Sequence, residues 1–440
     1  MSVVSLNAPV NNLKTAPTGR SIIVAALDIG STKVCCLIAR ISNSDLVVDV
    51  GSVNDGLKVL GFGHHRSVGL RAGAVVDMEA AEASVRAAVD HAERMAGVTI
   101  SSVYVSLSAG RPRTDQHRFS AAIDGHEVNK RHVGSLLSQV QKLGSNNGRT
   151  IIHNLPGGFI LDGERGIEDP VDMFGEKLSL NAHVVSVDTG PFRNIVSLVE
   201  RCHLSVDAVV VSPLASSMAC LVKDENELGV TCIDMGGGTT SIAAFADGGL
   251  IYADLIPLGG DHVTSDIARG LSTPSSYAER IKTLYGSALP SLSDDREMIS
   301  VPYVGEKSED AVNKIPRSML TGIIQPRIEE ILELVRARLN QTGYSEVAGK
   351  RLVITGGASQ MNGMRELAQR ILGKQVRLGT PHTLAGMPDM ALSASFSTCA
   401  GLISYARSPL AAKQNVPEWN MASSRSGYFV RVGQWIRENF

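Results

Sequence analysis

Two segments of the chain share one pattern of apolar and polar positions. "IIVAALDIGSTKVCCLIARI" and "GVTCIDMGGGTTSIAAFADG" each hold an apolar run that reaches an aspartate, a turn of small residues and a second apolar run. The aspartates, Asp28 and Asp234, lie about half a chain apart. Short apolar runs bounded by turn residues are typical of buried strands, so each segment predicts a strand–turn–strand unit. Such a motif occurring twice predicts two related α/β lobes.

Helical periodicity follows these units. "MEAAEASVRAAVDHAERMAG" has apolar residues at helical spacing, most clearly over 88–97, and it predicts a helix that stops at Gly97. The stretches 193–204 and 328–341 predict helices in the same way. Residues 351–372 predict a strand, a Gly356-Gly357 loop and a further helix.

The chain of 440 residues is longer than a single hydrophobic core normally supports, so we expect two or more domains. The remaining stretches suggest where their boundaries lie. Residues 1–20 lack the apolar centre of a signal peptide and predict a disordered leader. A β-rich stretch at about 104–185, interrupted by Gly and Pro, predicts a small inserted module. We expect a first lobe in 21–103, 186–226 and about 390–407. A second lobe would comprise 227–264 and 341–389, with a small subdomain at 265–340. A polar linker at 408–426 would then lead to a terminal helix at 427–440.

Composition excludes several classes of protein. A net charge of −2 gives no overall positive field that would attract nucleic acid. The sequence contains no run of 18 consecutive apolar residues, the length that a membrane-spanning helix needs. No cysteine pair has Cys-x-x-Cys spacing and no His-Glu-x-x-His occurs, so we expect reduced, buried thiols and histidines that bind no metal.

The two aspartate turns suit the phosphates of a nucleotide. Glycine lets backbone amides approach phosphate oxygens, and a carboxylate at a strand end can hold the water shell of Mg²⁺. The first phosphate-binding loop would contain Asp28, Gly30, Ser31 and Thr32. The second would contain Asp234, Gly236, Gly237, Gly238, Thr239 and Thr240. Lys33 would neutralise phosphate or lie on the outward face of the next strand. Neither a P-loop nor a Rossmann glycine motif is present.

The loops "DIGSTK", "DMGGGTT" and "TGGASQMNG" resemble the phosphate and adenosine loops of the actin/Hsp70/sugar-kinase ATPase superfamily. The chain is more closely similar to the FtsA family of bacterial cell division proteins. "GLRAGAVVDMEAA", "ELGVTCIDMGGGTTSIA", "VTSDIA" and "AERIK" occur in the order of that family, over roughly 20–440. The resemblance implies an α/β, actin-like, two-lobed ATPase fold of duplicated RNase H-like lobes, with an inserted small α+β module and a C-terminal amphipathic helix.

The resemblance also implies ATP and Mg²⁺ as cofactors. Residues 28–33 and 234–240 would clasp the phosphates, with Mg²⁺ held through water by Asp28 and Asp234. Gly356, Gly357, Ala358 and Met361 would back the adenosine, and Glu279 and Lys282 would reach the ribose and base, unless that pair lies on an ordinary solvated helix face.

Hydrolysis is less well supported. Filament-forming relatives place a glutamate before the second phosphate loop, where "VVVSPLASSMA" has Ser212. A serine hydroxyl is too weak a base to activate water near pH 7. We therefore expect no catalytic residue in this family's usual position, and slow or absent hydrolysis.

The C-terminal sequence "SGYFVRVGQWIRENF" predicts an amphipathic helix that lies in a membrane interface. Its apolar arc would contain Tyr428, Phe429, Val432, Trp435, Ile436 and Phe440, with Arg431 and Arg437 on the polar side. The alternative is a helix that docks on the core of the protein, for which the preceding linker would be unnecessary.

The resemblance implies a peripheral protein at the cytoplasmic face of the inner membrane, at the division septum. There it would polymerise into actin-like filaments, bind anionic lipids, anchor FtsZ through the small subdomain and recruit later division proteins through the inserted module. The alternatives are a PilM-like pilus-assembly adaptor, which is shorter and lacks the terminal helix, and a small-molecule kinase, which needs a carboxylate base in its cleft. The C-terminal sequence argues against both.

Overall fold

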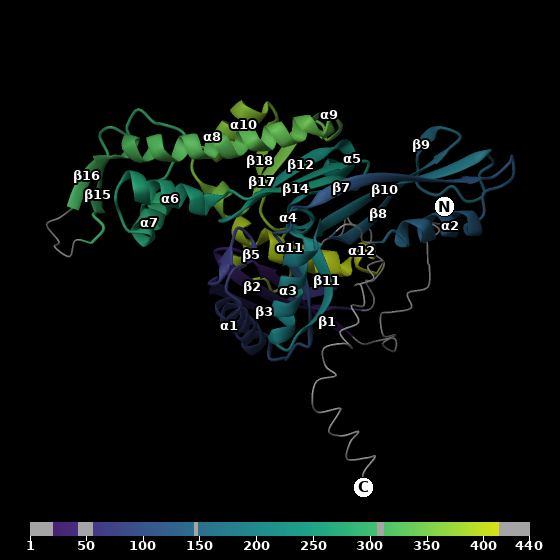
Figure 1. The fold of residues 1–440 in the computed structure, drawn as a ribbon, viewed down its shortest axis with the longest axis horizontal. Coiled ribbons are helices and arrows are strands. Elements are labelled where there is room, and N and C mark those ends of the chain that lie inside the picture. The colour runs from purple at the N-terminus through teal and green to yellow at the C-terminus, as the bar shows by residue number, and fades with distance from the viewer. Residues whose placement is uncertain (1–20, 43–55, 145–147, 306–311, 413–440) are drawn as a thin grey trace, which may run out of the picture.

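The computed structural model describes residues 21–42, 56–144, 148–305 and 312–412. The predicted leader and terminal helix lie outside these residues. Figure 1 shows two lobes one above the other, with smaller units projecting at opposite ends of the upper lobe. None of the helices in the described ranges is long and apolar enough to cross a membrane.

The first lobe is built on a five-stranded sheet in the order β11-β6-β1-β2-β3. The predicted strand–turn–strand unit is confirmed as the antiparallel pair β1–β2, and β3 continues the meander, whereas β6 and β11 add in parallel. The strands are β1 (Ile22–Ile29), β2 (Lys33–Ile41), β3 (Leu57–Arg66), β6 (Ser102–Leu107) and β11 (Ser205–Val211).

Helices and a small hairpin complete this lobe. Helix α1 (Met78–Ala96) packs on β2 and β3 and ends at Gly97, as predicted, because Gly97 adopts the left-handed conformation that closes a helix. Helix α3 (Thr189–Arg201) starts before the predicted 193–204 and follows the insert. The hairpin consists of β4 (Leu70–Arg71) and β5 (Ala74–Val75).

The second lobe repeats the first. Its sheet has the order β14-β13-β12-β17-β18, again with an antiparallel meander on one side and parallel strands on the other. The strands are β12 (Val230–Met235), β13 (Thr240–Ala246), β14 (Gly249–Ile256), β17 (Arg351–Thr355) and β18 (Gln375–Leu378). Helices α5 (Lys223–Leu228), α9 (Tyr344–Val347) and α10 (Met364–Leu372) belong to this region. The predicted duplication of an α/β lobe is thus confirmed.

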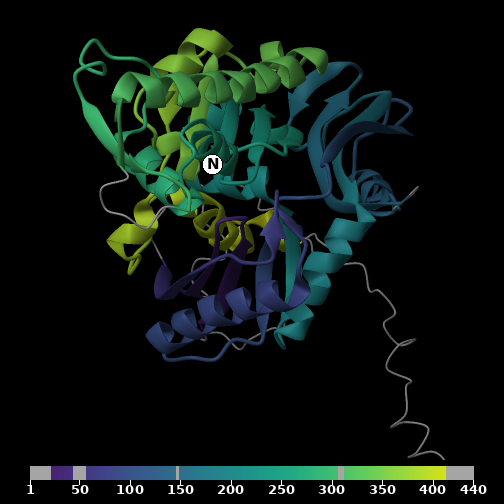
Figure 2. The ribbon, with the colours of Figure 1, turned by 60° about the vertical axis from the view of Figure 1, so that its left-hand side comes forward.

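Two helices in contact with each other, α4 (Ser212–Cys220) and α11 (Ser397–Arg407), lie between the two sheets, where Figure 2 shows the yellow α11. They approach so closely that a Cβ on Gly401 would fall 1.7 Å from the carbonyl oxygen of Ala215. A larger residue at position 401 would therefore separate the helices. The short helix α12 (Pro409–Ala412) follows α11.

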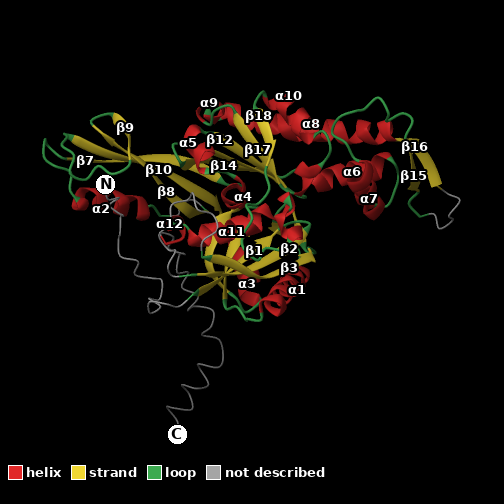
Figure 3. Cartoon of the chain, turned by 180° about the vertical axis from the view of Figure 1, so that it is seen from behind, coloured by secondary structure: helices red, strands yellow, loops and turns green. Residues whose placement is uncertain are grey.

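The inserted module has its own core and a four-stranded sheet in the order β7-β10-β8-β9, drawn in yellow in Figure 3. It comprises β7 (Arg113–Ala122), α2 (Lys130–Gln141), β8 (Arg149–Leu161), β9 (Glu164–Ile167) and β10 (Lys177–Asp188). The expected start at about 104 is too early, because β6 pairs with β1 and β11 in the first sheet. The insert meets the second lobe where the Ala253 amide donates to Thr114 Oγ1 at 2.9 Å.

At the other end of the second lobe lie α6 (Gly260–Gly270), α7 (Ser275–Tyr285), the hairpin of β15 (Met298–Pro302) and β16 (Val312–Pro316), and α8 (Arg317–Gln341). Helix α8 begins 11 residues before the predicted 328–341 and continues through Pro326. Buried Leu320, Ile324 and Ile328 lie on both sides of the proline, so packing holds the helix together.

Candidate functional site

The two predicted phosphate loops have the same local geometry and touch each other. The Gly30 amide donates to the Lys33 carbonyl at 3.0 Å, and the Gly236 amide donates to the Thr239 carbonyl at 2.9 Å. A Cβ on Gly237 would lie 2.3 Å from Thr32 Cγ2. A Cβ on Gly238 would lie 2.3 Å from Ser31 Oγ. Only glycine lets the loops of the two lobes meet this closely.

Asp28, at the end of β1, is buried and only 7% exposed. Ser106 Oγ on the neighbouring strand β6 donates to its Oδ1 at 2.6 Å. Burial raises the pKa of Asp28, while the Ser106 hydrogen bond and the charge of Lys33 lower it by less. The carboxylate is thus held in a fixed orientation with its charge incompletely balanced.

Asp234 occupies the equivalent position at the end of β12. Its pKa is raised to about 6: burial is the largest cause and the charge of Asp28 adds to it, whereas hydrogen bonds from Thr398 and Ser216 and the charge of Lys33 partly offset the rise. Two carboxylates whose pKa values are both raised by burial, at the meeting point of two glycine loops, suit a hydrated divalent cation. The residues present therefore fit Mg²⁺ held through water, which would neutralise phosphate oxygens between the two loops.

The predicted adenosine loop abuts the second phosphate loop. Gly356 has φ 90°, and a Cβ there would lie 2.3 Å from Asp234 Oδ1. Its amide donates to the Ala394 carbonyl at 3.2 Å. Gly357, Ala358 and Gln360 form a 3₁₀ turn, and Ala358 and Met361 pack against the core of the second lobe.

Lys282 lies on α7 and is not on a solvated helix face. Its side chain is 12% exposed, whereas that of Glu279 is 51% exposed. Lys282 Nζ donates to the Gly260 carbonyl at 3.1 Å, to Thr264 Oγ1 at 2.8 Å and to Glu279 Oε2 at 2.6 Å. The structure thus ties the predicted Glu279–Lys282 pair to the start of α6, beside the second phosphate loop.

The sequence analysis missed the start of α6. The amides of Gly260 and Asp261 donate to the carbonyls of Gly236 and Gly237 at 3.0 and 2.8 Å. A Cβ on Gly259 would lie 2.5 Å from both of those carbonyl oxygens. Burial raises the pKa of Asp261, and the charge of Lys282 lowers it. The glycine pair before a helical pattern in "LGGDHVTSDIA" was the available signal.

Ser212 stands at the first position of α4, buried, and its hydroxyl shares a hydrogen bond with that of Ser108. Both groups are neutral alcohols, so neither supplies the charge that an activating carboxylate would.

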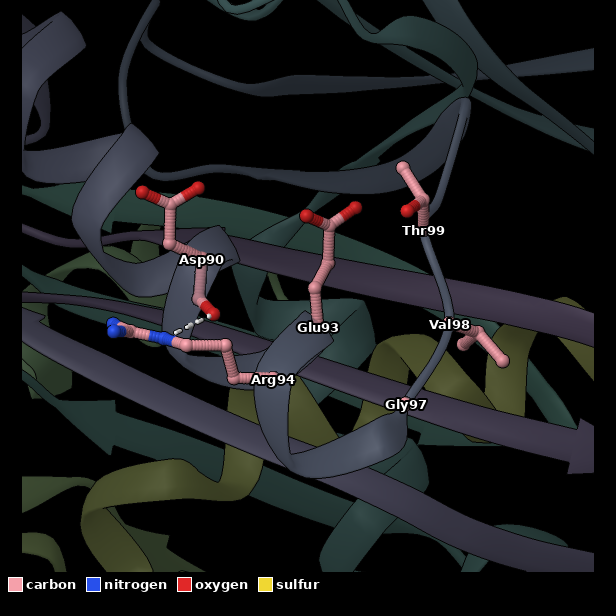
Figure 4. Close-up of a pocket in the computed structure, with 6 residues that line it drawn as sticks. All are labelled: Asp90, Glu93, Arg94, Gly97, Val98 and Thr99. Atoms are coloured by element: carbon pink, nitrogen blue, oxygen red, sulfur yellow. Dashed lines mark hydrogen bonds between the residues drawn. The ribbon is translucent and has the colours of Figure 1, made fainter.

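A separate shallow pocket of about 420 Å³ lies at the C-terminal end of α1 (Figure 4). Its lining consists of Asp90, Glu93, Arg94, Gly97, Val98 and Thr99. None of the residues predicted to bind nucleotide lines it.

Comparison with known proteins identifies the family of the chain. Residues 231–401 match the family described as "Cell division protein FtsA", and residues 109–186 match "SHS2 domain inserted in FTSA". A cell division protein FtsA from Rhizobium meliloti (strain 1021) is 44% identical over 440 residues, covering 99% of each chain. The chain belongs to the FtsA family. The FtsA of Escherichia coli (strain K12) is 34% identical over 425 residues, covering 95% of this chain and 98% of that protein.

Solved structures show that this FtsA family member has the actin-like ATPase fold, and the family match over residues 109–186 identifies its insert as the SHS2 module. A PilM-PilN type IV pilus biogenesis complex aligns with TM-score 0.58 and 14% identity, covering 88% of this chain and 99% of that chain. MreB5 of Spiroplasma citri bound to ADP aligns with TM-score 0.50 and 14% identity, covering 87% and 95%. At such low identity these likenesses concern the fold alone.

Proposed function

We propose that the chain binds ATP with Mg²⁺ between its two lobes and acts as a nucleotide-dependent, filament-forming protein of the division septum. The observation that supports this most is the convergence of two glycine loops on Asp28 and Asp234. The backbone amides of these loops would bind the phosphates, and the start of α6, whose amides pair with the Gly236 and Gly237 carbonyls, would hold the second loop in place. The MreB5 neighbour was solved with ADP, which supports a nucleotide in the same fold.

Within this proposal, each predicted residue has a defined task. Asp28 and Asp234 hold the water shell of the cation, and residues 30–33 and 236–240 surround the phosphates. Gly356, Gly357, Ala358 and Met361 form one wall for the adenosine. Lys282 and Glu279 close the opposite side, where Lys282 already contacts Gly260. Hydrolysis is slow, because Ser212 and Ser108 satisfy each other and offer no base.

The septal role rests on membership of the FtsA family. We propose that filaments form on the cytoplasmic face of the membrane, bind FtsZ through the region 265–340 and recruit later division proteins through the insert. The C-terminal sequence, with Tyr428, Phe429, Val432, Trp435, Ile436 and Phe440 on one helical face, would bind anionic lipid. A role in pilus assembly has support only from the fold, whereas the FtsA relatives cover nearly the whole chain.

Isothermal titration of Mg·ATP into the wild type and Asp234→Ala tests the nucleotide site. The matched control is Asp224→Ala, which removes an exposed carboxylate from α5 of the same lobe. We expect Asp234→Ala to fold, as judged by circular dichroism, and to lose ATP binding, while the control keeps it. Wild-type affinity in a folded Asp234→Ala protein would contradict the proposed site.

A further inference from the structure

Lys33 follows the first phosphate loop, yet its ammonium group makes a different contact from the one expected of a phosphate ligand. Lys33 Nζ donates to the carbonyl oxygen of Ser395. The same atom lies over the ring of Phe396, 3.9 Å from its centroid. The ammonium is thus held by a backbone acceptor and an aromatic face at once, and the outward-facing alternative is wrong.

The segment that receives Lys33 belongs to the connection between the lobes. Residues Ala394–Phe396 form a short 3₁₀ helix that leads into α11. Phe396 is 7% exposed and packs edge-on against Phe62 of β3, with ring centroids 5.1 Å apart. His64, two residues further along β3, packs edge-on against the same ring at 5.9 Å. Phe396 is therefore anchored in the first lobe.

The other side of this segment holds the adenosine loop of the second lobe. The Ala394 carbonyl accepts the Gly356 amide at 3.2 Å, and Ser395 Oγ accepts from Gln360 Nε2 at 2.9 Å. A Cβ on Gly357 would lie 3.1 Å from Ser395 Oγ, so loop and segment are in close contact. Contacts thus run without a break from Lys33 to residues 356–360.

We propose that Lys33 is a positioning residue that holds the adenosine loop against the first lobe through Ser395 and Phe396. This inference rests on the proposed nucleotide site and changes the role of one residue in it. Burial lowers the pKa of Lys33, and the charges of Asp28 and Asp234 raise it in part, so its ammonium depends on nearby partners. By holding Ser395 in place, Lys33 positions the adenosine loop, against which the base would stack. It does so already in the nucleotide-free protein.

Hydrogen exchange in the nucleotide-free, full-length protein tests this, since a phosphate ligand has no role there. Lys33→Met keeps the length of the side chain and removes its charge and donors. We expect the amides of residues 356–361 to exchange about ten-fold faster in Lys33→Met, since a charge-assisted contact is lost. Arg40→Met, at an exposed position on the same strand, is the control and should leave exchange there unchanged.

A second variant separates this inference from general destabilisation. Phe396→Leu removes the aromatic face and should also speed exchange at 356–361, by about three-fold. Combining it with Lys33→Met should add little, since both changes break one contact chain. Additive effects would overturn the proposal, because the two residues would then act separately. Unchanged exchange at 356–361 together with reduced ATP affinity would also overturn it and would make Lys33 a phosphate ligand. If exchange rises as expected but the wild type binds no ATP, the positioning role stands and the proposed function fails.

Discussion

Thr398 Oγ1 donates a 2.9 Å hydrogen bond to Asp234 Oδ2, joining the first turn of α11 to the second phosphate loop. The bond favours the ionised carboxylate, which burial otherwise disfavours. The charge state of Asp234 thus depends on a residue from a distant part of the chain, and several properties of the site follow from it.

Nucleotide affinity should depend on pH. Because burial raises the pKa of Asp234 to about 6, the ionised form that holds hydrated Mg²⁺ is lost as pH falls through that value. We expect Mg·ATP affinity to be nearly constant above about pH 7 and to fall about ten-fold per unit well below pH 6. Titration calorimetry between pH 5 and 8 measures this, and Thr398→Val should move the transition to higher pH. Affinity that does not change with pH would contradict the role of Asp234.

The same shift predicts an effect on stability without nucleotide. The pKa of Asp234 is raised from 3.8 to about 6 on folding, so its contribution favours the folded state at low pH and is lost as pH rises through about 6. At pH 7.5 the buried charge destabilises the protein. Because the cost of the buried charge builds up between pH 3.8 and about 6, we expect Asp234→Asn to raise the melting temperature at pH 7.5 and to raise it about half as much at pH 5. Scanning fluorimetry at both pH values checks this, and a lower melting temperature at pH 7.5 would be the contrary result.

Gly356 and its neighbour Gly357 form a matched pair. Gly356 combines φ 90° with a Cβ position 2.3 Å from Asp234 Oδ1, whereas a Cβ on Gly357 would meet Ser395 Oγ at 3.1 Å. We expect Gly356→Ala to weaken ATP binding by at least about 100-fold, because the loop must move off Asp234. Gly357→Ala should cost less than about ten-fold. Equal effects of the two changes would show that loop composition, rather than contact with Asp234, sets affinity.

An ion pair of the second lobe, with a buried Glu225 and a 40% exposed Arg377, predicts a stability effect. Arg377 donates to both carboxylate oxygens of Glu225, at 2.7 and 2.6 Å, and the Glu225 side chain is 5% exposed. Removing Arg377 leaves the buried Glu225 carboxylate unpaired, and because solvent already screens the 40% exposed Arg377, the cost should fall below the roughly 3 to 5 kcal/mol of a fully buried pair. Arg377→Met should therefore lower the melting temperature by several degrees, whereas Arg377→Met with Glu225→Gln should recover much of the loss. Lys223→Met, at an exposed position of α5, is the control. A silent Arg377→Met variant would refute this.

Turnover of ATP should be slow, below about 1 per second, the lower end of typical enzymes. Ser212 and Ser108 share a partly buried hydrogen bond, and neither can act as a general base near neutral pH. Ser212→Ala should leave phosphate release unchanged within about two-fold. A coupled phosphate assay on protein freed of contaminating ATPases measures both. Rapid turnover, or its loss in Ser212→Ala, would show that the serine takes part in the chemistry.

The sequence predicted the parts of the fold that local pattern determines. The units β1–β2 and β12–β13 each contain two strands, a turn and an aspartate within about 20 residues, so the local pattern alone was enough to predict both strand–turn–strand units. Residues 104–107 could not be assigned in this way. Their apolar run suits any buried strand, and only pairing with β1 places them in the first sheet.

Tertiary packing decided the rest. Pro326 normally ends a helix, but here it is exposed, and the carbonyl it would obstruct belongs to Gly322, which is also exposed. Ser106 donates to Asp28 from 78 residues away in the sequence, and Thr398 donates to Asp234 from 164 residues away. Neither residue belongs to a recognisable sequence motif, so neither contact could be predicted. The contact of Lys33 with Ser395 spans 362 residues, so sequence could only suggest the commoner role of a lysine beside a phosphate loop.

Co-sedimentation of the full-length protein with Mg·ATP and vesicles containing anionic lipid tests the central proposal most directly. We expect the wild type to form polymers on the vesicles with ATP, Asp234→Ala to form none, and a chain lacking residues 427–440 to bind ATP but leave the vesicles. Each C-terminal segment, if helical as the sequence predicts, should add modest affinity, which is multiplied where a filament carries many such segments. Vesicle binding by the chain lacking residues 427–440 would contradict the proposed membrane attachment. Polymers that form equally well without ATP and with Asp234→Ala would contradict a nucleotide-dependent filament.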